Sequence, residues 1–324
     1  MERRTFLGMT GGLLAAPLAA AAQRMPKVSF LCPGPCSALP NPVFDVDRAF
    51  LAGLDRGGFI FGRNASLDIS GVGVGYDRLP EAVRTLVQRN VDVILTVGNE
   101  ATRVAGAATT STPIVMLNVA DAVEEGLVAS LGRPGANVTG LSVPLAQIAA
   151  KRIEFLREIN PRLNRVAALW HSSLDRHVDR TARLERVAAS LGVQLTGLGV
   201  MTFRDLDQAF GSTGRPDGLL LFENVTGALA REITLFALKH RIPTAGPDRL
   251  FAQGGGLLAY GPHMPDLYDR AALYAAKILR GARPSELPVE QPTRFELIIN
   301  KGVAGGLGLA LPPSLLQRAD QMIE

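Results

Sequence analysis

Cysteine, tryptophan and histidine are scarce in this chain, which contains two, one and four of them among 324 residues. No two histidines have the His-Glu-x-x-His spacing of a zinc protease. The two cysteines are separated by three residues, and the second half of a zinc knuckle is missing. We therefore expect neither a metal nor a cofactor.

The signatures of hydrolases and nucleotide-binding proteins are also missing. No Gly-x-Ser-x-Gly nucleophile elbow occurs. The first predicted strand is followed by Pro33-Gly34-Pro35-Cys36 instead of the Gly-x-Gly-x-x-Gly dinucleotide fingerprint. The stretch "LGRPGANVTGLS" lacks the Gly-Lys-Ser/Thr ending of a phosphate loop and precedes a strand. Its Gly132 is better explained as the end of a helix. We expect a protein that is not an enzyme.

Charge of one sign is nowhere concentrated. Lys and Arg number 34 against 30 Asp and Glu, and these residues are scattered along the chain. No basic run with interleaved aromatic residues is present, so nucleic-acid binding is not expected. The composition, 47% hydrophobic and 20% charged, is that of a globular protein. The length exceeds what one hydrophobic core usually serves, which predicts two domains.

Residues 1–22 have the features of a secretory signal peptide. The segment begins with Arg3-Arg4, continues without charge from Phe6 to Ala22, and ends in an Ala-x-Ala cleavage site. Arg-Arg-x-Phe-Leu resembles a twin-arginine signal, and a Sec signal is the alternative. The apolar stretch is too short for a membrane span, and no later stretch is long enough. We expect an exported protein that is soluble in the periplasm.

Cys32 and Cys36 both follow the predicted cleavage site. An oxidising compartment would allow them to pair around Pro33-Gly34-Pro35. Their spacing is not that of the Cys-x-x-Cys redox motif. A local disulfide and two free thiols both remain open.

Short apolar runs alternate with segments of helical periodicity over the rest of the chain. Such continuous apolar runs are typical of parallel strands covered by helices on both faces. The predicted strands are Val28–Cys32, Leu67–Ser70, Val93–Val97, Ile114–Asn118, Val138–Leu141, Val166–Trp170, Gln194–Leu198, Gly218–Phe222, Ile242–Ala245 and Leu257–Tyr260. The predicted helices are Phe44–Leu54, Leu79–Asn90, Glu100–Ala108, Ala122–Leu131, Ala146–Glu158, Asp175–Leu191, Leu206–Phe210, Thr226–His240 and Pro265–Leu279.

This order predicts an α/β protein with two Rossmann-like lobes, each built on a parallel sheet of about five strands. Pro243 places its strand near a sheet edge, and one further strand is expected in "LPVEQPTRFELIIN". Ligands of such sheets bind beyond the carboxyl ends of the strands. The candidate residues there are Ser37, Asn99, Asn118, Asp121, Thr139, His171, Glu223, Asn224 and Asp248.

Several segments make the chain similar to a known family. They include "YDRLPEAVRTLVQRNVDVILTVG", "TPIVMLNVADAVEEGLVASLGRPGANVTGLS", "AAKRIEFLREINP", "GGLLAYGP" and the last 38 residues from "LPVEQPTRFELIIN" onward. In this order they resemble the substrate-binding proteins of ABC importers, in particular the tryptophan/tyrosine type. The chain departs from the family pattern in the first-strand loop, "CPGPCSALPNP", and at Trp170-His171.

The resemblance implies a type I periplasmic-binding fold that closes on an amino acid or related small polar solute and delivers it to an ABC permease. We expect a monomer. The signal peptide would be residues 1–22, the first lobe 23–141 plus 262–286, and the second lobe 142–261 plus 287–324. Thr139 to Pro144 would form the first crossing between lobes. An exported nicotinamide-dependent oxidoreductase and a ligand sensor for a membrane signalling partner are the alternatives.

An amino acid needs hydrogen-bond donors for its carboxylate and acceptors for its ammonium group. Helix amino termini supply donors, and Asp121 or Glu223 would accept from the ammonium. Asn99, Asn118 and Asn224 could serve either role. Helix capping is the alternative explanation for Asn118 and Asp121. The ligand's identity does not follow from the sequence.

Overall fold

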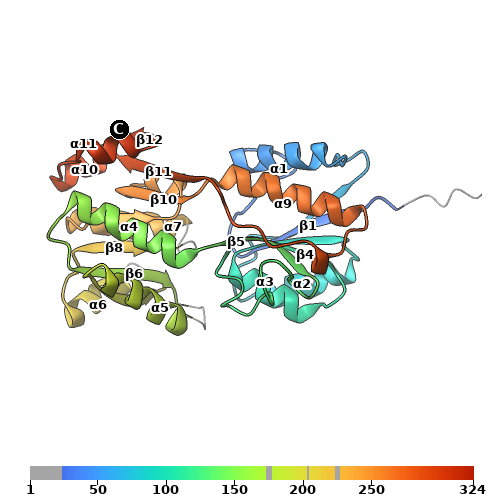
Figure 1. The fold of residues 1–324 in the computed structure, drawn as a ribbon, viewed down its shortest axis with the longest axis horizontal. Coiled ribbons are helices and arrows are strands. Elements are labelled where there is room, and N and C mark those ends of the chain that lie inside the picture. Colours follow the sequence, from blue (N-terminus) through green and yellow to red (C-terminus); the bar gives the residue numbers. More distant parts are fainter. Residues whose placement is uncertain (1–23, 173–176, 203, 223–226) are drawn as a thin grey trace, which may run out of the picture.

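The computed structural model describes residues 24–172, 177–202, 204–222 and 227–324. The predicted signal peptide, Glu223 and Asn224 lie outside the described residues. The chain forms two β-sheets, each flanked by helices, which lie side by side in Figure 1. No helix within the described ranges is long and apolar enough to span a bilayer.

The first lobe is built on a five-stranded parallel sheet with the strand order β2-β1-β3-β4-β5. Its two faces carry separate apolar clusters, one with Phe30 and Leu95, the other with Leu31 and Ile94. This alternation explains why the strands read as continuous apolar runs. The elements are β1 (Lys27–Cys32), α1 (Asp45–Arg56), β2 (Ser66–Val72), α2 (Leu79–Gln88), β3 (Val93–Val97), α3 (Asn99–Ala108), β4 (Ile114–Ala120) and β5 (Val138–Val143).

The second lobe contains a seven-stranded sheet with the order β12-β11-β10-β9-β8-β6-β7, one strand more than the six expected there, which include the strand in "LPVEQPTRFELIIN". All neighbouring pairs are parallel except β10 and β11. The elements that follow β5 along the chain are α4 (Leu145–Ile159), β6 (Arg165–His171), α5 (His177–Ser190), β7 (Gln194–Val200), α6 (Arg204–Thr213), β8 (Gly218–Leu221), α7 (Gly227–Lys239), β9 (Thr244–Gly246), α8 (Arg249–Gln253), β10 (Leu258–Pro262), α9 (Met264–Leu279), η1 (Pro284–Glu286), β11 (Phe295–Asn300), α10 (Lys301–Leu307), α11 (Pro313–Arg318) and β12 (Gln321–Ile323).

Helix α9 packs in the first lobe, although the strands before and after it belong to the second. It lies beside α1 in Figure 1. Their backbones approach so closely that a Cβ atom on Gly53 would lie 2.5 Å from the carbonyl oxygen of Asp269. The Tyr268 ring stacks on Phe30 of β1, with 6.3 Å between ring centroids. The carboxy-terminal part of the chain therefore completes the amino-terminal core.

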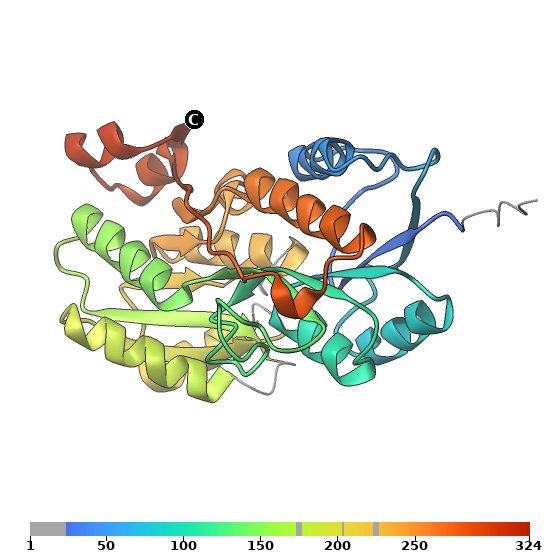
Figure 2. The same ribbon diagram turned by 45° about the vertical axis from the view of Figure 1, so that its right-hand side comes forward.

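The chain crosses between the lobes three times: from β5 to α4, from β10 to α9, and from η1 to β11. Figure 2 shows the third crossing running back from the first lobe to the carboxy-terminal elements. This segment pairs with β5, because Glu290 N donates to Gly140 O and Ser142 N donates to Glu290 O, both at 2.9 Å. The exact residue boundaries of the two lobes stay a prediction.

The predicted helix Ala122–Leu131 is wrong, because these residues form successive turns. Asp121 and Gly126 have left-handed backbones, with φ of 47° and 68°, which a continuous helix cannot contain. Ala122 and Val128 are nevertheless buried. The apolar residues at helical spacing are therefore buried as predicted, but they are buried in a loop and not in a helix.

The predicted edge position of the Pro243 strand is also wrong. Strand β9 lies between β10 and β8 in the interior of the sheet. Pro243 directly precedes β9 and contributes only its carbonyl, which accepts from Leu219 N at 2.9 Å. Because that position needs no backbone donor, proline is tolerated there. The short strand β12, which pairs with β11, was not predicted.

Candidate functional site

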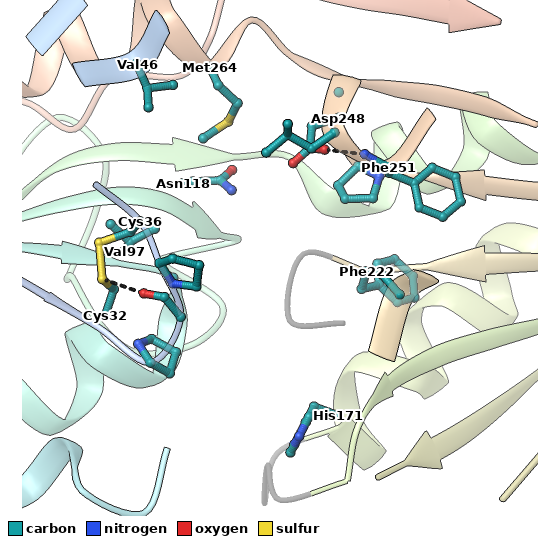
Figure 3. Close-up of a pocket in the computed structure, with 18 of the residues that line it drawn as sticks. Cys32, Cys36, Val46, Val97, Asn118, His171, Phe222, Asp248, Phe251 and Met264 are labelled. Atoms are coloured by element: carbon teal, nitrogen blue, oxygen red, sulfur yellow. Dashed lines mark hydrogen bonds between the residues drawn. A yellow bond between two sulfur atoms is a disulfide. The ribbon is translucent and has the colours of Figure 1, made fainter. Parts of the chain in front are cut away.

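A cavity of about 1380 Å³ lies between the two lobes. Its walls come from both sheets, at the carboxyl ends of the strands, as Figure 3 shows. Val46, Val97 and Met264 line the side of the first lobe, and Phe222 and Phe251 line the opposite side. Charged side chains also line the cavity, among them Arg48, Arg180, Glu100 and Glu296. The wall therefore combines apolar surface with polar groups, as sites for small molecules do.

A disulfide between Cys32 and Cys36 shapes the wall directly after β1. The structure thus decides between the two states that the sequence left open. The loop is fixed from behind by Tyr268, whose hydroxyl donates to the carbonyl oxygen of Cys36 at 2.6 Å. Burial raises the pKa of this tyrosine, so the phenol stays protonated and able to donate.

Asn99 lies on the cavity wall at the start of α3, but its side chain is already paired. Its Nδ2 donates to Ala120 O at 2.7 Å, and its Oδ1 accepts from Ala120 N at 2.9 Å. The backbone before it turns at Gly98, where φ is 84°. The N–H groups of Asn99, Glu100 and Ala101 have no acceptor among the described residues, and all three residues line the cavity. They form a site suited to a negatively charged group.

Asn118 lies near the carboxyl end of β4 and points toward the space between the lobes (Figure 3). Its backbone is left-handed, with φ of 53°, a conformation that asparagine tolerates better than most residues. Its buried Oδ1 has no hydrogen-bond partner within the described part of the chain. Because an unpaired buried polar atom is unfavourable, Asn118 is a strong candidate for ligand contact.

His171 and Asp248 line the opposite wall. The His171 ring lies 5.2 Å from the ring of Tyr76 in the first lobe, measured between centroids. Burial lowers the pKa of His171, which favours the neutral imidazole. Burial, reinforced by the charge of Glu100, raises the pKa of Tyr76 to about 12. Asp248 accepts from Phe251 N at 3.0 Å and thereby caps α8.

Three predicted site residues do not line the cavity. Ser37 donates from its hydroxyl to Asp47 at 2.7 Å. Asp121 accepts from Leu145 N at 3.0 Å, at the start of α4 and not at the helix expected after it. Thr139 is buried and bonded to the third crossing. Of the nine predicted residues, Asn99, Asn118, His171 and Asp248 lie on the wall, and their contact with a ligand stays a prediction.

Sequence reasoning missed Tyr76 as a residue of the cavity wall. It directly follows "GVGVG", the stretch in which β2 ends. The carboxyl end of β2 meets the same edge of the sheet as those of β3 and β4, so this position carried the same signal as Asn99 and Asn118.

The described residues contain no cluster of three or more His, Cys, Asp or Glu side chains that could hold a metal.

Comparison with known proteins gives a consistent picture. The family model of the ABC transporter substrate-binding proteins matches residues 51–323. A tyrosine-binding protein of Clostridioides difficile is 24% identical over 264 residues, which cover 81% of this chain and 76% of that protein.

Similar solved structures share the same architecture. A conserved domain protein from Vibrio cholerae is 25% identical, with a TM-score of 0.80, covering 92% of this chain and 100% of that one. A domain from Streptococcus pneumoniae in complex with L-Trp is 21% identical, with a TM-score of 0.78 and coverages of 92% and 99%. A ligand-free, open substrate-binding protein from Clostridium difficile has the same identity and coverages, with a TM-score of 0.64. These likenesses agree with the type I periplasmic-binding fold expected from the sequence.

Proposed function

Because this chain belongs to the ABC transporter substrate-binding protein family, whose members are binding proteins and not enzymes, we propose that it is the periplasmic receptor of an ABC importer. It binds a small polar solute, an amino acid or a related molecule, between its lobes and delivers it to a permease. The observation that carries the proposal is Asn118 Oδ1, which has no hydrogen-bond partner among the described residues, close to the first N–H groups of α3, which likewise have no acceptor there. The tyrosine and L-Trp named for two similar proteins support an amino acid.

The two polar features complement the two ends of an amino acid. The carboxylate would accept from the first N–H groups of α3, where the helix dipole adds a favourable field. The ammonium group would donate to Asn118 Oδ1, which otherwise lacks a partner. The side chain would then lie among the aromatic and aliphatic residues of the wall, such as Val97, Phe222 and Met264.

Binding couples to the arrangement of the lobes. The carboxyl ends of both sheets face the cavity, so a solute held there contacts both lobes at once. A ligand that contacts both lobes stabilises the closed arrangement over the open one by its differential affinity. A permease could then distinguish the loaded from the empty receptor by shape.

A ligand screen tests the proposal directly. The purified mature protein is heated with each of the common amino acids, with aromatic acids and with nicotinamide cofactors, and its unfolding temperature is recorded. A true ligand at 100 times its Kd stabilises the folded state by about 2.7 kcal/mol. Trp170, the single tryptophan, lines the cavity and reports binding of non-fluorescent solutes by its emission. Stabilisation by a nicotinamide cofactor, with no response to any small solute, would overturn the receptor proposal.

Export to the periplasm forms part of the same proposal and has its own test. Cell fractionation should place the protein in the periplasm, with an amino terminus near Gln23. Replacing Arg3-Arg4 by Lys-Lys should block export by the twin-arginine route and leave Sec export unaffected. Retention of the unprocessed wild-type chain in the cytoplasm would contradict this part of the proposal.

A further inference from the structure

Glu125 is a buried carboxylate at the contact between the lobes, with 4% of its side chain exposed. It lies in the turns that follow β4 of the first lobe. Its Oε2 accepts from Arg103 of α3 at 2.9 Å. Its Oε1 lies 3.1 Å from Arg180 and accepts from Arg183 at 3.0 Å, and both of these arginines belong to α5 of the second lobe. One carboxylate therefore joins both lobes.

The charges around Glu125 are unequal. Three guanidinium groups surround it. Among the described residues, Glu100 is the one further carboxylate within ion-pair distance of these groups, at 3.7 Å from Arg103, and the charge of Asp121 interacts with Arg183 and Arg180. Without the charge of Glu125, two arginines of one lobe would face an arginine of the other in a partly buried space. Such an arrangement is strongly repulsive, and separation of the lobes would relieve it.

The cluster lies at the contact between the lobes and reaches the cavity, whose wall includes Glu100, Arg103 and Arg180. Neither Glu125 nor Arg183 lines the cavity. The Tyr76–His171 contact joins the same two lobes. Elsewhere on the cavity wall Val43 of the first lobe and Leu250 of the second remain 68% and 64% exposed. The charged cluster therefore lies where the lobes are in contact, whereas these apolar rim residues are uncovered.

We propose that Glu125 determines ligand affinity without touching the ligand, by holding the lobes in the arrangement that binds. This inference rests on the proposed receptor function. The apparent Kd of a protein equals its intrinsic Kd divided by the fraction of molecules in the competent arrangement. Loss of the Glu125 charge lowers that fraction, so affinity falls although no residue of the cavity wall has been replaced. Glu125 is a positioning residue in this sense.

The test compares three single variants in the mature protein. Glu125→Gln removes the central charge, and Arg183→Gln removes a partner in the second lobe that is 26% exposed and outside the cavity. Glu124→Gln, at the exposed neighbouring position, is the matched control. Spin labels at Gln88→Cys and Lys239→Cys, exposed positions in the two lobes, measure the distance between lobes without any ligand. Calorimetric titration with L-tyrosine and L-tryptophan measures affinity.

We expect Glu125→Gln and Arg183→Gln to populate longer distances and to raise the Kd about tenfold or more. Glu124→Gln should match the wild type in both measurements. Unchanged distances, or a Kd within about twofold of wild type in both variants, would overturn the inference. If Glu125→Gln does not fold, Arg183→Gln decides alone. If neither amino acid binds the wild type, the receptor proposal loses its amino-acid ligand, while the ligand-free distances still confirm or refute the role of Glu125 in holding the lobes.

Discussion

Asn99 and Ala120 are joined by two hydrogen bonds, in which the side-chain amide of Asn99 pairs with the backbone N–H and C=O of Ala120. This pairing ties the start of α3 to the end of β4 across the floor of the cavity. It occupies one polar side chain of the wall, whereas Oδ1 of the neighbouring Asn118 has no hydrogen-bond partner among the described residues. The two asparagines therefore have different expected roles, although the sequence assigned them the same one.

Replacing Asn118 by glycine should weaken binding of the best solute by about tenfold, the effect of losing a buried hydrogen bond to a charged group. Glycine is preferable to alanine here, because it adopts the left-handed backbone at φ 53° without strain. Titration of Trp170 emission measures the change. Asn99→Ala provides the comparison, since it should chiefly lower the free energy of unfolding. An Asn118→Gly protein with wild-type affinity would remove Asn118 from the site.

Gly140→Ala should lower the free energy of unfolding by about 3 kcal/mol. Gly140 has φ of 129°, and a Cβ atom there would lie 2.2 Å from the carbonyl oxygen of Met116 on the neighbouring strand. Gly132→Ala, in the loop before β5, is the control, because nothing lies within 4 Å of its Cβ position. Urea unfolding of both variants measures the difference. Equal stabilities would show that the backbone of β5 shifts to accommodate the methyl group.

Asp121→Asn should alter how stability depends on pH. Burial raises the pKa of Asp121 in the folded state above its ordinary value of 3.8. As the pH falls through the raised pKa, the Asp121 carboxylate binds a proton in the folded state before it does so in the unfolded state. The free energy of unfolding therefore gains a favourable contribution and increases. At neutral pH this contribution is absent.

The asparagine variant lacks this contribution and keeps an oxygen that can accept from Leu145 N. It should equal or exceed the wild type in stability at neutral pH and lose that advantage as the pH falls toward 3.8. Denaturant unfolding across this pH range provides the measurement. A constant difference between the two proteins at all pH values would contradict the assignment.

Removing the disulfide should cost about 2 kcal/mol of stability, the chain-entropy value for so short a loop. The experiment compares Cys32→Ala/Cys36→Ala with the wild type in guanidinium chloride, with and without a reducing agent. Reduction should lower the wild type to the level of the double variant and leave the variant unchanged. Because the loop lines the cavity, solute affinity should fall as well. A double variant that binds the solute like the wild type would show that the loop acts only on stability.

The order of strands and helices could be predicted because the apolar runs are continuous and the helical faces are regular. The errors occur where burial does not require regular structure. Residues 122–131 bury apolar side chains at helical spacing, yet Gly126 and the contacts of Glu125 hold them in turns. Pro243 was assigned to a sheet edge because a proline lacks a backbone donor, but it precedes an interior strand where none is needed.

The candidate site could be predicted only in outline. The rule that ligands bind at strand ends leads to Asn118 and His171 on the cavity wall. The rule fails for Thr139, because its hydroxyl donates to Leu287 O and does not face the cavity. Leu287 is 148 residues away along the chain, so the sequence does not reveal this contact. The role of Glu125 could not be predicted either, because its partners on α5 become neighbours only when the lobes meet.

The stacking of Tyr268 on Phe30 has a consequence for synthesis of the chain. Translation proceeds from the amino terminus, so β1 to β5 leave the ribosome long before α9, which covers one face of their sheet. That face stays exposed while β6 to β10 are being made. The core of the first lobe is therefore completed only after α9 has been made, and we expect its apolar surface to need shielding until then.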